Sequence, residues 1–324
     1  MYEQFYGLQE KPFLLTPDAD LFYLSRHHKA ALNMLEYGLH GHASFIAITG
    51  EVGTGKTTLI RRFLQEVDES STVGVITNTH RSFGDLLQWI LLAFGLDYKN
   101  KDKVELYDVF VDFLINEYAA NRRTMLIIDE AQNMDVETLE ELRMLSNVNL
   151  RKDLVLQTVL VGQPELLDIL KRPDMRQLAQ RISVEYHLVP LTCQETVEYI
   201  RHRVSTVGGR PDLFDPTACV VIHHLTQGIP RLINVLCDTA LVYGFAEDQE
   251  QIDFETICAV VQDKQRGGLA ALKMNLTDVS LGDLSKDLAR LAKSCDLDEG
   301  EAIDGEEERG NNPPSVFSER ASET

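Results

Sequence analysis

The feature that most constrains the fold of this chain is a glycine-rich loop, GEVGTGKT, at residues 50–57. A short continuous apolar run at residues 45–49 precedes it, which is typical of a strand buried on both faces, and a helical pattern over residues 55–67 follows. The loop fits the pattern GxxxxGK[ST] in the strand–loop–helix context in which that pattern binds phosphate. The sequence therefore predicts a P-loop nucleotide-binding fold.

Each residue type in this loop has a chemical reason. Glycines let backbone N–H groups turn toward phosphate oxygens, and the start of the following helix adds the positive end of its dipole. We expect Lys56 to reach the β- and γ-phosphates and Thr57 to place its hydroxyl on Mg²⁺, so the expected cofactors are ATP and Mg²⁺. The expected nucleotide-binding residues of the loop are Gly50, Glu51, Val52, Gly53, Thr54, Gly55, Lys56, Thr57 and Thr58.

A second motif, MLIIDE at residues 125–130, ends an apolar run in two carboxylates. Ligands collect at the carboxyl edge of an open α/β sheet, which is where these two side chains would lie. We expect Asp129 to accept Mg²⁺ through water and Glu130 to act as the base that polarises the attacking water.

Four further polar residues are candidates for the catalytic site. Gln163 follows an apolar run and is a candidate contact between the γ-phosphate and the water, with a plain helix N-terminal residue as the alternative. Arg181, or as second choice Arg176, would reach the γ-phosphate of a neighbouring subunit, with a surface salt bridge as the alternative. Arg231, at the start of a helix, would couple the helical domain to the nucleotide, with a solvated arginine as the alternative.

Apolar runs and helical patterns alternate before residue 190, and this predicts a parallel five-stranded sheet with helices on both faces. The expected strands cover residues 45–49, 73–78, 125–129, 154–161 and 183–188. After them come only helical patterns, at residues 194–206, 216–226, 230–245 and 253–264. We therefore expect three parts: an α/β nucleotide-binding domain (1–190), a small all-α lid domain (191–264) and an acidic tail (265–324).

The tail is rich in Gly, Pro, Ser and acidic residues, so we expect most of it to be disordered. One helical face within it carries leucines, which predicts either a nascent helix without a partner or a docking helix. These leucines are Leu281, Leu284, Leu288 and Leu291.

The net charge of the chain indicates which classes of partner it can bind. The formal net charge is −20, which disfavours nucleic-acid binding by bulk charge. Local basic pairs such as Arg61-Arg62 nevertheless leave DNA open as a partner. The longest apolar stretch, residues 86–96, is too short to span a bilayer. We expect a cytoplasmic protein, peripheral at the inner membrane only through a partner.

The order of these motifs resembles that of the AAA+ ATPases, with Walker A, Walker B, sensor 1, arginine finger and sensor 2 in a helical lid. Several stretches resemble the general secretion pathway protein A family and its relatives in pilus biogenesis and exosortase-associated polysaccharide export. These stretches are MYEQFYGLQEKPF, TPDADLFYLSRHHKAAL, TGEVGTGKTTL, LIIDEAQNM, LVGQPEL, RQLAQRIS and GIPRLINVLCDTAL. The resemblance covers residues 1–264. It implies that residues 13–32 lie over the adenine and that subunits assemble into rings with ATP sites between them.

The function that this resemblance implies is a Mg²⁺-dependent ATPase that drives assembly of a cell-envelope machine, with an inner-membrane protein as partner. Many members of the family continue into a membrane span and a periplasmic peptidoglycan-binding domain, whereas residues 265–324 are polar and acidic. Two alternatives stay open. A DNA-associated regulatory ATPase is weakened by the net charge, and a nucleotide-gated adaptor is weakened by Glu130, since a pure switch needs no catalytic base.

Overall fold

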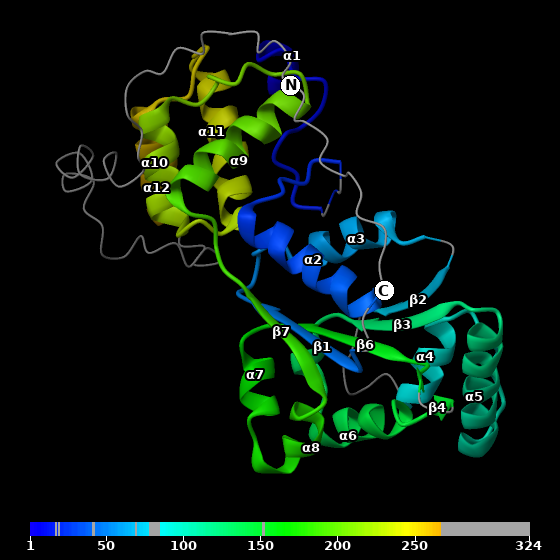
Figure 1. Cartoon of the computed structure of the whole chain (residues 1–324). Helices are drawn as coiled ribbons and strands as arrows, with labels where there is room; N and C mark the ends of the chain where they lie inside the picture. The colour runs from blue at the N-terminus through cyan, green and yellow to red at the C-terminus, as the bar shows by residue number, and fades with distance from the viewer. Residues whose placement is uncertain are drawn as a thin grey trace, which may run out of the picture.

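The computed structural model describes residues 1–16, 18, 20–40, 43–68, 70–77, 85–150 and 153–266. A twisted sheet covered by helices forms one part of the molecule, and a bundle of helices stands beside it (Figure 1). The predictions for the tail, including the leucine face at residues 281–291, lie outside the described residues. Among those that are described, no helix has the length and apolar character needed to cross a membrane.

The sheet has the strand order β2-β3-β6-β1-β7, and all neighbouring strands run parallel. This arrangement confirms the predicted α/β fold class. Every residue of β1 and of β6 is buried, as expected of central parallel strands with helices on both faces. The strands are β1 (Phe45–Gly50), β2 (Ser71–Ile76), β3 (Arg123–Ile128), β6 (Gln157–Gly162) and β7 (Ile182–Leu188).

Successive strand residues feed two different cores, because side chains of a strand point alternately to opposite faces. Ile46, Ile48 and Ile127 pack with helices α2 (Arg26–His40) and α3 (Lys56–Glu66) on one face. Phe45 and Leu126 pack with helices on the other face. Those helices are α4 (Leu86–Ala93), α5 (Lys103–Ala119), α6 (Val136–Leu145), α7 (Glu165–Leu170) and α8 (Arg176–Ala179), with the short turns η2 (Ala131–Asn133) and η3 (Pro173–Met175).

The predicted fourth strand at residues 154–161 was wrong at its start. The strand of the main sheet begins at Gln157, whereas β5 (Asp153–Leu154) pairs antiparallel with β4 (Asn149–Leu150) in a separate hairpin. Val155 and Leu156 between them are buried, so the apolar run continues through the break and its pattern cannot show where one strand ends and the next begins.

Helices α9 to α12 form the bundle beside the sheet. Their bounds, Cys193–Thr206, Pro216–Thr226, Pro230–Ala246 and Phe254–Arg266, lie close to those predicted. The core of the bundle also includes Tyr2 of helix α1 (Tyr2–Phe5) and, further along the N-terminal segment, Tyr6, Phe13 and Leu21. The N-terminal residues therefore pack into the bundle instead of the sheet, and the predicted domain division at residue 190 stays a prediction.

Candidate nucleotide-binding site

The glycine-rich loop connects β1 to α3, as its motif requires. Gly53 and Gly55 have φ angles of +87° and +98°, a left-handed backbone that residues with a Cβ atom rarely adopt. A Cβ atom on Gly53 would lie 2.8 Å from Cβ of Arg231, and one on Gly55 would lie 2.9 Å from Nε2 of His28. Both glycines are thus needed twice, for the turn and for the close approach of a neighbouring element.

The Lys56 ammonium lies inside the loop. Its Nζ donates to the carbonyl oxygens of Gly50 at 2.7 Å and of Glu51 at 2.9 Å. Burial lowers the pKa of Lys56, while the carboxylates of Glu130 and Asp129 act to raise it. The loop is also closed by the hydroxyl of Thr54, which donates to the Glu51 carbonyl at 2.9 Å. Lys56 is therefore a buried cation beside the two acidic residues that follow β3.

Thr57 and Asp129 meet at the carboxyl edge of the sheet. The Thr57 hydroxyl donates to Oδ2 of Asp129 at 2.8 Å, and the Glu130 N–H donates to Oδ1 at 2.9 Å. Burial raises the pKa of Asp129, partly offset by these two hydrogen bonds.

This pair of oxygens fits Mg²⁺, which prefers hard oxygen ligands and keeps several waters. In the described part of the chain, no cluster of three or more His, Cys, Asp or Glu side chains is suited to a metal. A bound Mg²⁺ would therefore take most of its ligands from phosphate and water.

Glu130 follows Asp129 with a left-handed backbone, at φ +55°. A residue other than glycine in this conformation is strained, and such strain clusters at functional sites. The Glu130 carboxylate accepts hydrogen bonds from the side-chain amides of Gln132 at 2.5 Å and Gln163 at 3.1 Å. The backbone N–H of Gln163 in turn donates to Oε1 of Gln132 at 3.0 Å. The structure thus brings Gln163 directly to Glu130, while its contact with the γ-phosphate and the water stays a prediction.

Gln132 was missed in the sequence. It lies two residues after Glu130 in the run DEAQN, so its proximity to the carboxylate could have been noticed. Its second contact, with the end of β6, joins residues far apart in the chain and leaves no local pattern.

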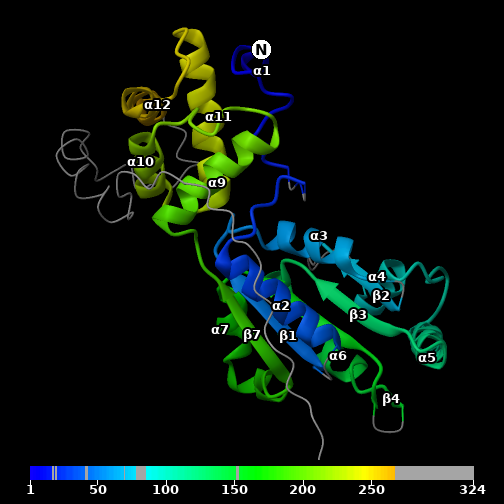
Figure 2. The same cartoon turned by 45° about the horizontal axis from the view of Figure 1, so that its top comes forward.

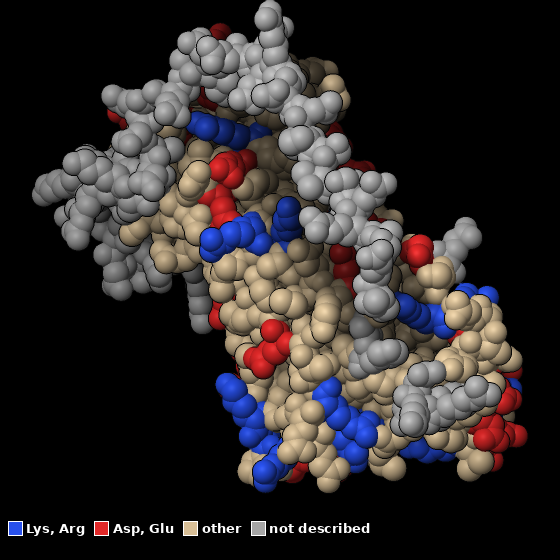
Figure 3. Space-filling view, viewed as in Figure 1, with Lys and Arg blue, Asp and Glu red and all other residues tan. Residues whose placement is uncertain are grey.

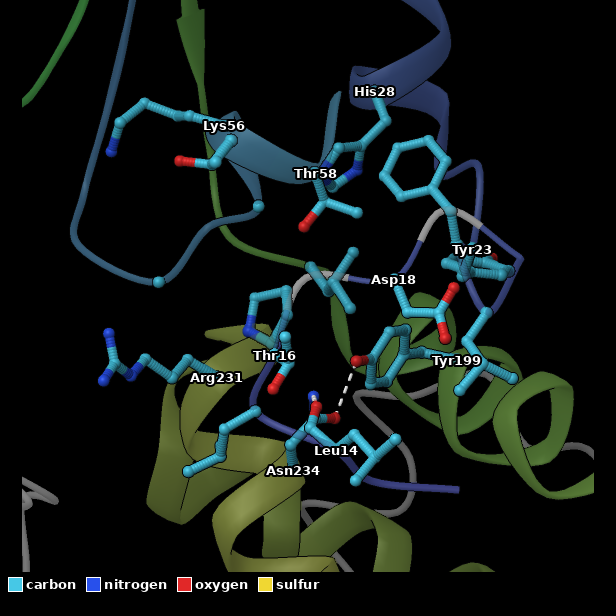
Figure 4. Close-up of a pocket in the computed structure, with 18 of the residues that line it drawn as sticks. Leu14, Thr16, Asp18, Tyr23, His28, Lys56, Thr58, Tyr199, Arg231 and Asn234 are labelled. Carbon is cyan, nitrogen blue, oxygen red and sulfur yellow. Dashed lines mark hydrogen bonds between the residues drawn. The ribbon is translucent and has the colours of Figure 1, made fainter. Parts of the chain in front are cut away.

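A pocket opens between the loop and the bundle (Figure 4). Val52, Thr58 and Arg231 line it together with Gly53, Gly55, Lys56, Thr57, Glu130 and Gln163. The Arg231 N–H donates to the Gly53 carbonyl at 3.2 Å, which fixes the start of α11 on the loop. Figure 4 shows Lys56 and Arg231 on one side of the pocket, with Tyr23 and Tyr199 on the other.

The rest of the pocket wall comes from the N-terminal segment and the bundle. Leu14, Leu15, Thr16, Asp18, Leu21, Phe22 and Tyr23 line it together with Tyr199, Arg203 and Asn234. Asn234 donates to the Leu14 carbonyl at 3.2 Å and accepts from the Tyr199 hydroxyl at 2.7 Å. The segment that the resemblance placed over the adenine therefore lines the pocket, whereas Asn234 and Tyr199 were missed because helical residues that pair across the fold carry no local signal.

His28 is another residue that sequence reasoning missed. It belongs to α2 and is buried against the loop, with Nε2 at 3.0 Å from the Thr54 carbonyl and Nδ1 at 2.7 Å from the Ser25 hydroxyl. Because a carbonyl can only accept, Nε2 carries the proton and Nδ1 accepts from Ser25. Burial lowers the pKa of His28, which favours this neutral form.

The two arginines proposed to act on a neighbour do not line this pocket. Arg181 donates to the Ser146 hydroxyl at 2.9 Å and to the Arg143 carbonyl at 3.3 Å, and it also bonds Asn147. Arg176 is exposed beside a second hollow near β7. The structure therefore places both on a different side of the subunit from Lys56.

Comparison with known proteins finds relatives that cover most of the chain. The AAA domain family matches residues 39–170. General secretion pathway protein A of Aeromonas hydrophila is 42% identical over 253 residues, which are 78% of this chain but only 46%, about half, of that protein's length. Cdc6p of Pyrobaculum aerophilum superposes with a TM-score of 0.61 at 14% identity, over 85% of this chain and 84% of that chain. The ORC2 protein of Aeropyrum pernix superposes with a TM-score of 0.54 at 18% identity, over 85% and 81%.

At such low identity the two solved structures are evidence for the fold alone. In this chain the fold carries the P-loop and the paired carboxylates at one sheet edge, and the sequence match to the bacterial relative covers 78% of the chain. The chain therefore belongs to the AAA+ family and, within it, is a relative of general secretion pathway protein A.

Proposed function

We propose that this protein is a Mg²⁺-dependent ATPase that uses ATP binding and hydrolysis at subunit interfaces to drive assembly of a cell-envelope machine. The observation that carries the ATPase part is the meeting of Lys56, the Thr57–Asp129 pair and Glu130 around one pocket. Each group alone has an ordinary structural explanation, but together they match the parts that phosphoryl transfer needs.

The roles follow from the contacts. Lys56 would exchange the Gly50 and Glu51 carbonyls for phosphate oxygens, since its cation is already desolvated there. Thr57 and Asp129 would hold Mg²⁺, which when bound neutralises charge on the phosphates. Glu130 would accept a proton from the attacking water, while the amide of Gln163 orients its carboxylate. Arg231 would sense the γ-phosphate from the bundle.

We propose that Arg181 or Arg176 completes the site of a neighbouring copy. What supports this is their position away from the chain's own pocket, together with the ring assembly that the resemblance implies. In that arrangement each ATP lies between two subunits, and an arginine from one stabilises charge that develops at the other. Mixing Arg181→Ala with Lys56→Ala subunits should then recover ATP turnover that neither has alone, and no recovery at any ratio would count against an action in trans.

The envelope part of the proposal rests on the relative at 42% identity, which is named for the general secretion pathway. Because the chain spans only 46% of that protein, the machine is named by class alone: secretion, pilus or polysaccharide export. We propose a cytoplasmic location, with attachment to the inner membrane through a protein partner.

Crosslinking of a variant that binds ATP without hydrolysing it tests which machine the protein serves. Glu130→Gln should hold ATP without hydrolysing it, so it should keep its partner bound when expressed in the native cell and crosslinked. Lys56→Ala, which should lose nucleotide, is the matched control. Recovery of inner-membrane assembly components with Glu130→Gln alone would support the proposal. Recovery of transposition or replication proteins in a nuclease-sensitive complex would overturn it in favour of a DNA-associated regulator.

A further inference from the structure

Helix α5 carries a second apolar stripe besides the one that packs on the sheet. Leu106, Phe110 and Leu114 are buried under the helix. The second stripe starts at Val104 and repeats at spacings of three, four, four and three, so it forms one continuous helical face. We call it the α5 stripe, and it consists of Val104, Tyr107, Val111, Ile115 and Tyr118.

The α5 stripe is open to solvent. Val104 is 69% exposed, Tyr107 42%, Ile115 39% and Tyr118 37%. The helix lies at the outer edge of the sheet in both Figure 1 and Figure 2. Single exposed apolar residues are common, but a row of them along one helix marks an interaction surface. This stripe also lies far along the sheet from the nucleotide pocket, none of whose lining residues belongs to α5.

An acidic row flanks the stripe on the side away from the sheet. Glu105, Asp108 and Asp112 follow one another at spacings of three and four, and all three are exposed. Figure 3 shows acidic side chains gathered at the edge where Figure 1 places α5. The neighbouring cation, Lys103, already pairs with Glu141 at 2.7 Å and with Asp85 at 3.7 Å. Within the described residues no ion pair involves Asp108 or Asp112.

We propose that the α5 stripe is a docking surface for a partner protein that presents an amphipathic helix with a basic flank. An apolar helix face repeating at three and four residues is matched by another such face, as in helix-in-groove recognition. The acidic row then selects lysines and arginines along one edge of the incoming helix and penalises acidic ones. Tyr107 and Tyr118 are the aromatic anchors of the surface, a residue type enriched at binding hot spots.

The charge also argues against the other occupants. Carboxylates repel the phosphates of nucleic acid and of anionic lipid. The end of the chain's own tail carries the acidic run DLDEGEAIDGEEE at residues 296–308, which has the same sign as the row on α5. The leucine-bearing part of the tail also holds Lys286, Arg290 and Lys293, so its occupancy of the stripe is one outcome of the test below. A basic helix of a different protein is the occupant that both the apolar spacing and the charge favour.

The test is binding of a synthetic helical peptide to the full chain, followed by fluorescence anisotropy. The peptide carries leucines at positions i, i+3, i+4 and i+7 and lysines along one flank. A scrambled peptide of equal composition and a peptide with glutamate in place of lysine are the controls. We expect saturable binding of the first peptide alone, weakened by salt because the flank contributes charge.

Two variants assign that binding to α5. Tyr107→Ser with Ile115→Ser should weaken it about tenfold or more, whereas Met34→Ser with Tyr37→Ser, on the exposed face of α2, should leave it unchanged. Asp108→Asn with Asp112→Asn should weaken it less and reduce its salt dependence, while Asp168→Asn on α7 should do neither. Far-ultraviolet circular dichroism of each variant checks that the fold is kept.

Four results would overturn the proposal. The first is equal affinity of the α2 and α5 variants for the peptide. The second is a wild-type dimer in sedimentation that the Tyr107 and Ile115 substitutions dissolve, since a second copy would then occupy the stripe. The third is peptide binding that appears only after residues 267–324 are removed, which would make the tail the occupant. The fourth is binding to phosphatidylglycerol vesicles that the same substitutions abolish.

Discussion

Replacing Gly53 with alanine tests how the phosphate-binding loop and helix α11 depend on each other. At φ +87°, a Cβ atom on this residue would lie 2.8 Å from Cβ of Arg231 and 3.1 Å from Cγ2 of Ile229. The left-handed backbone alone costs an alanine about 1–2 kcal/mol. Relief of the clash displaces α11 and breaks the hydrogen bond from the Arg231 N–H to the Gly53 carbonyl, which contributes about 1 kcal/mol.

We therefore expect Gly53→Ala to lose about 2–3 kcal/mol of unfolding free energy in a denaturant titration. We also expect its affinity for ATP to fall tenfold or more, which corresponds to about 1.4 kcal/mol of binding free energy. The reason is that Arg231 and the loop would no longer line the same space. Unfolding followed by circular dichroism and ATP binding followed by calorimetry measure the two effects separately.

Gly95→Ala is the matched control. Gly95 has φ +70° and no atom within 4 Å of its would-be Cβ. It should therefore lose only the backbone cost of about 1–2 kcal/mol, with ATP affinity unchanged. If Gly53→Ala behaves like Gly95→Ala in both assays, the contact between the loop and α11 supports neither folding nor nucleotide binding.

Two further predictions concern protonation and metal. Burial lowers the pKa of His28 below its ordinary value of 6.5, while Glu195 acts to raise it and His27 to lower it. The unfolded chain therefore binds the proton first, so the unfolding free energy should fall as the pH drops below 6.5, by up to about 1.4 kcal/mol per pH unit. His28→Gln should flatten that slope in denaturant titrations, and an unchanged slope would contradict it. Thr57→Ala should weaken the Mg²⁺ dependence of ATP binding in calorimetry. An unaltered Mg²⁺ titration would show that Thr57 does not hold the metal.

The parts of the site that sequence reasoning found are those in which chemistry and local pattern coincide. The loop from Gly50 to Thr57 and the pair Asp129-Glu130 each occupy consecutive positions at a strand end, so their spacing in the chain is their spacing in space. The central strands were found for a similar reason, because burial on both faces makes them continuous apolar runs.

The parts that were missed depend on contacts between distant residues. His28 reaches the loop from α2, and Asn234 reaches Leu14 from α11, so neither stands out where it lies in the sequence. Helix α5 was not predicted from the sequence, because its two apolar stripes together remove the one-sided pattern by which amphipathic helices are recognised. That lost amphipathicity is itself the sign of the surface that we propose for a partner.

ATP hydrolysis at the Glu130 site is tested by phosphate release from the purified full chain with ATP and Mg²⁺, compared between wild type and Glu130→Gln. The wild-type chain should hydrolyse ATP, and chelation of Mg²⁺ should stop it. Glu130→Gln should bind ATP with similar affinity. Its rate of hydrolysis should be lower than that of the wild type by about 100-fold or more, as expected when the water loses its base. Wild-type turnover in the variant would show that the base lies elsewhere. No hydrolysis by the wild-type chain, alone or assembled, would contradict the account and leave a nucleotide-gated adaptor in its place.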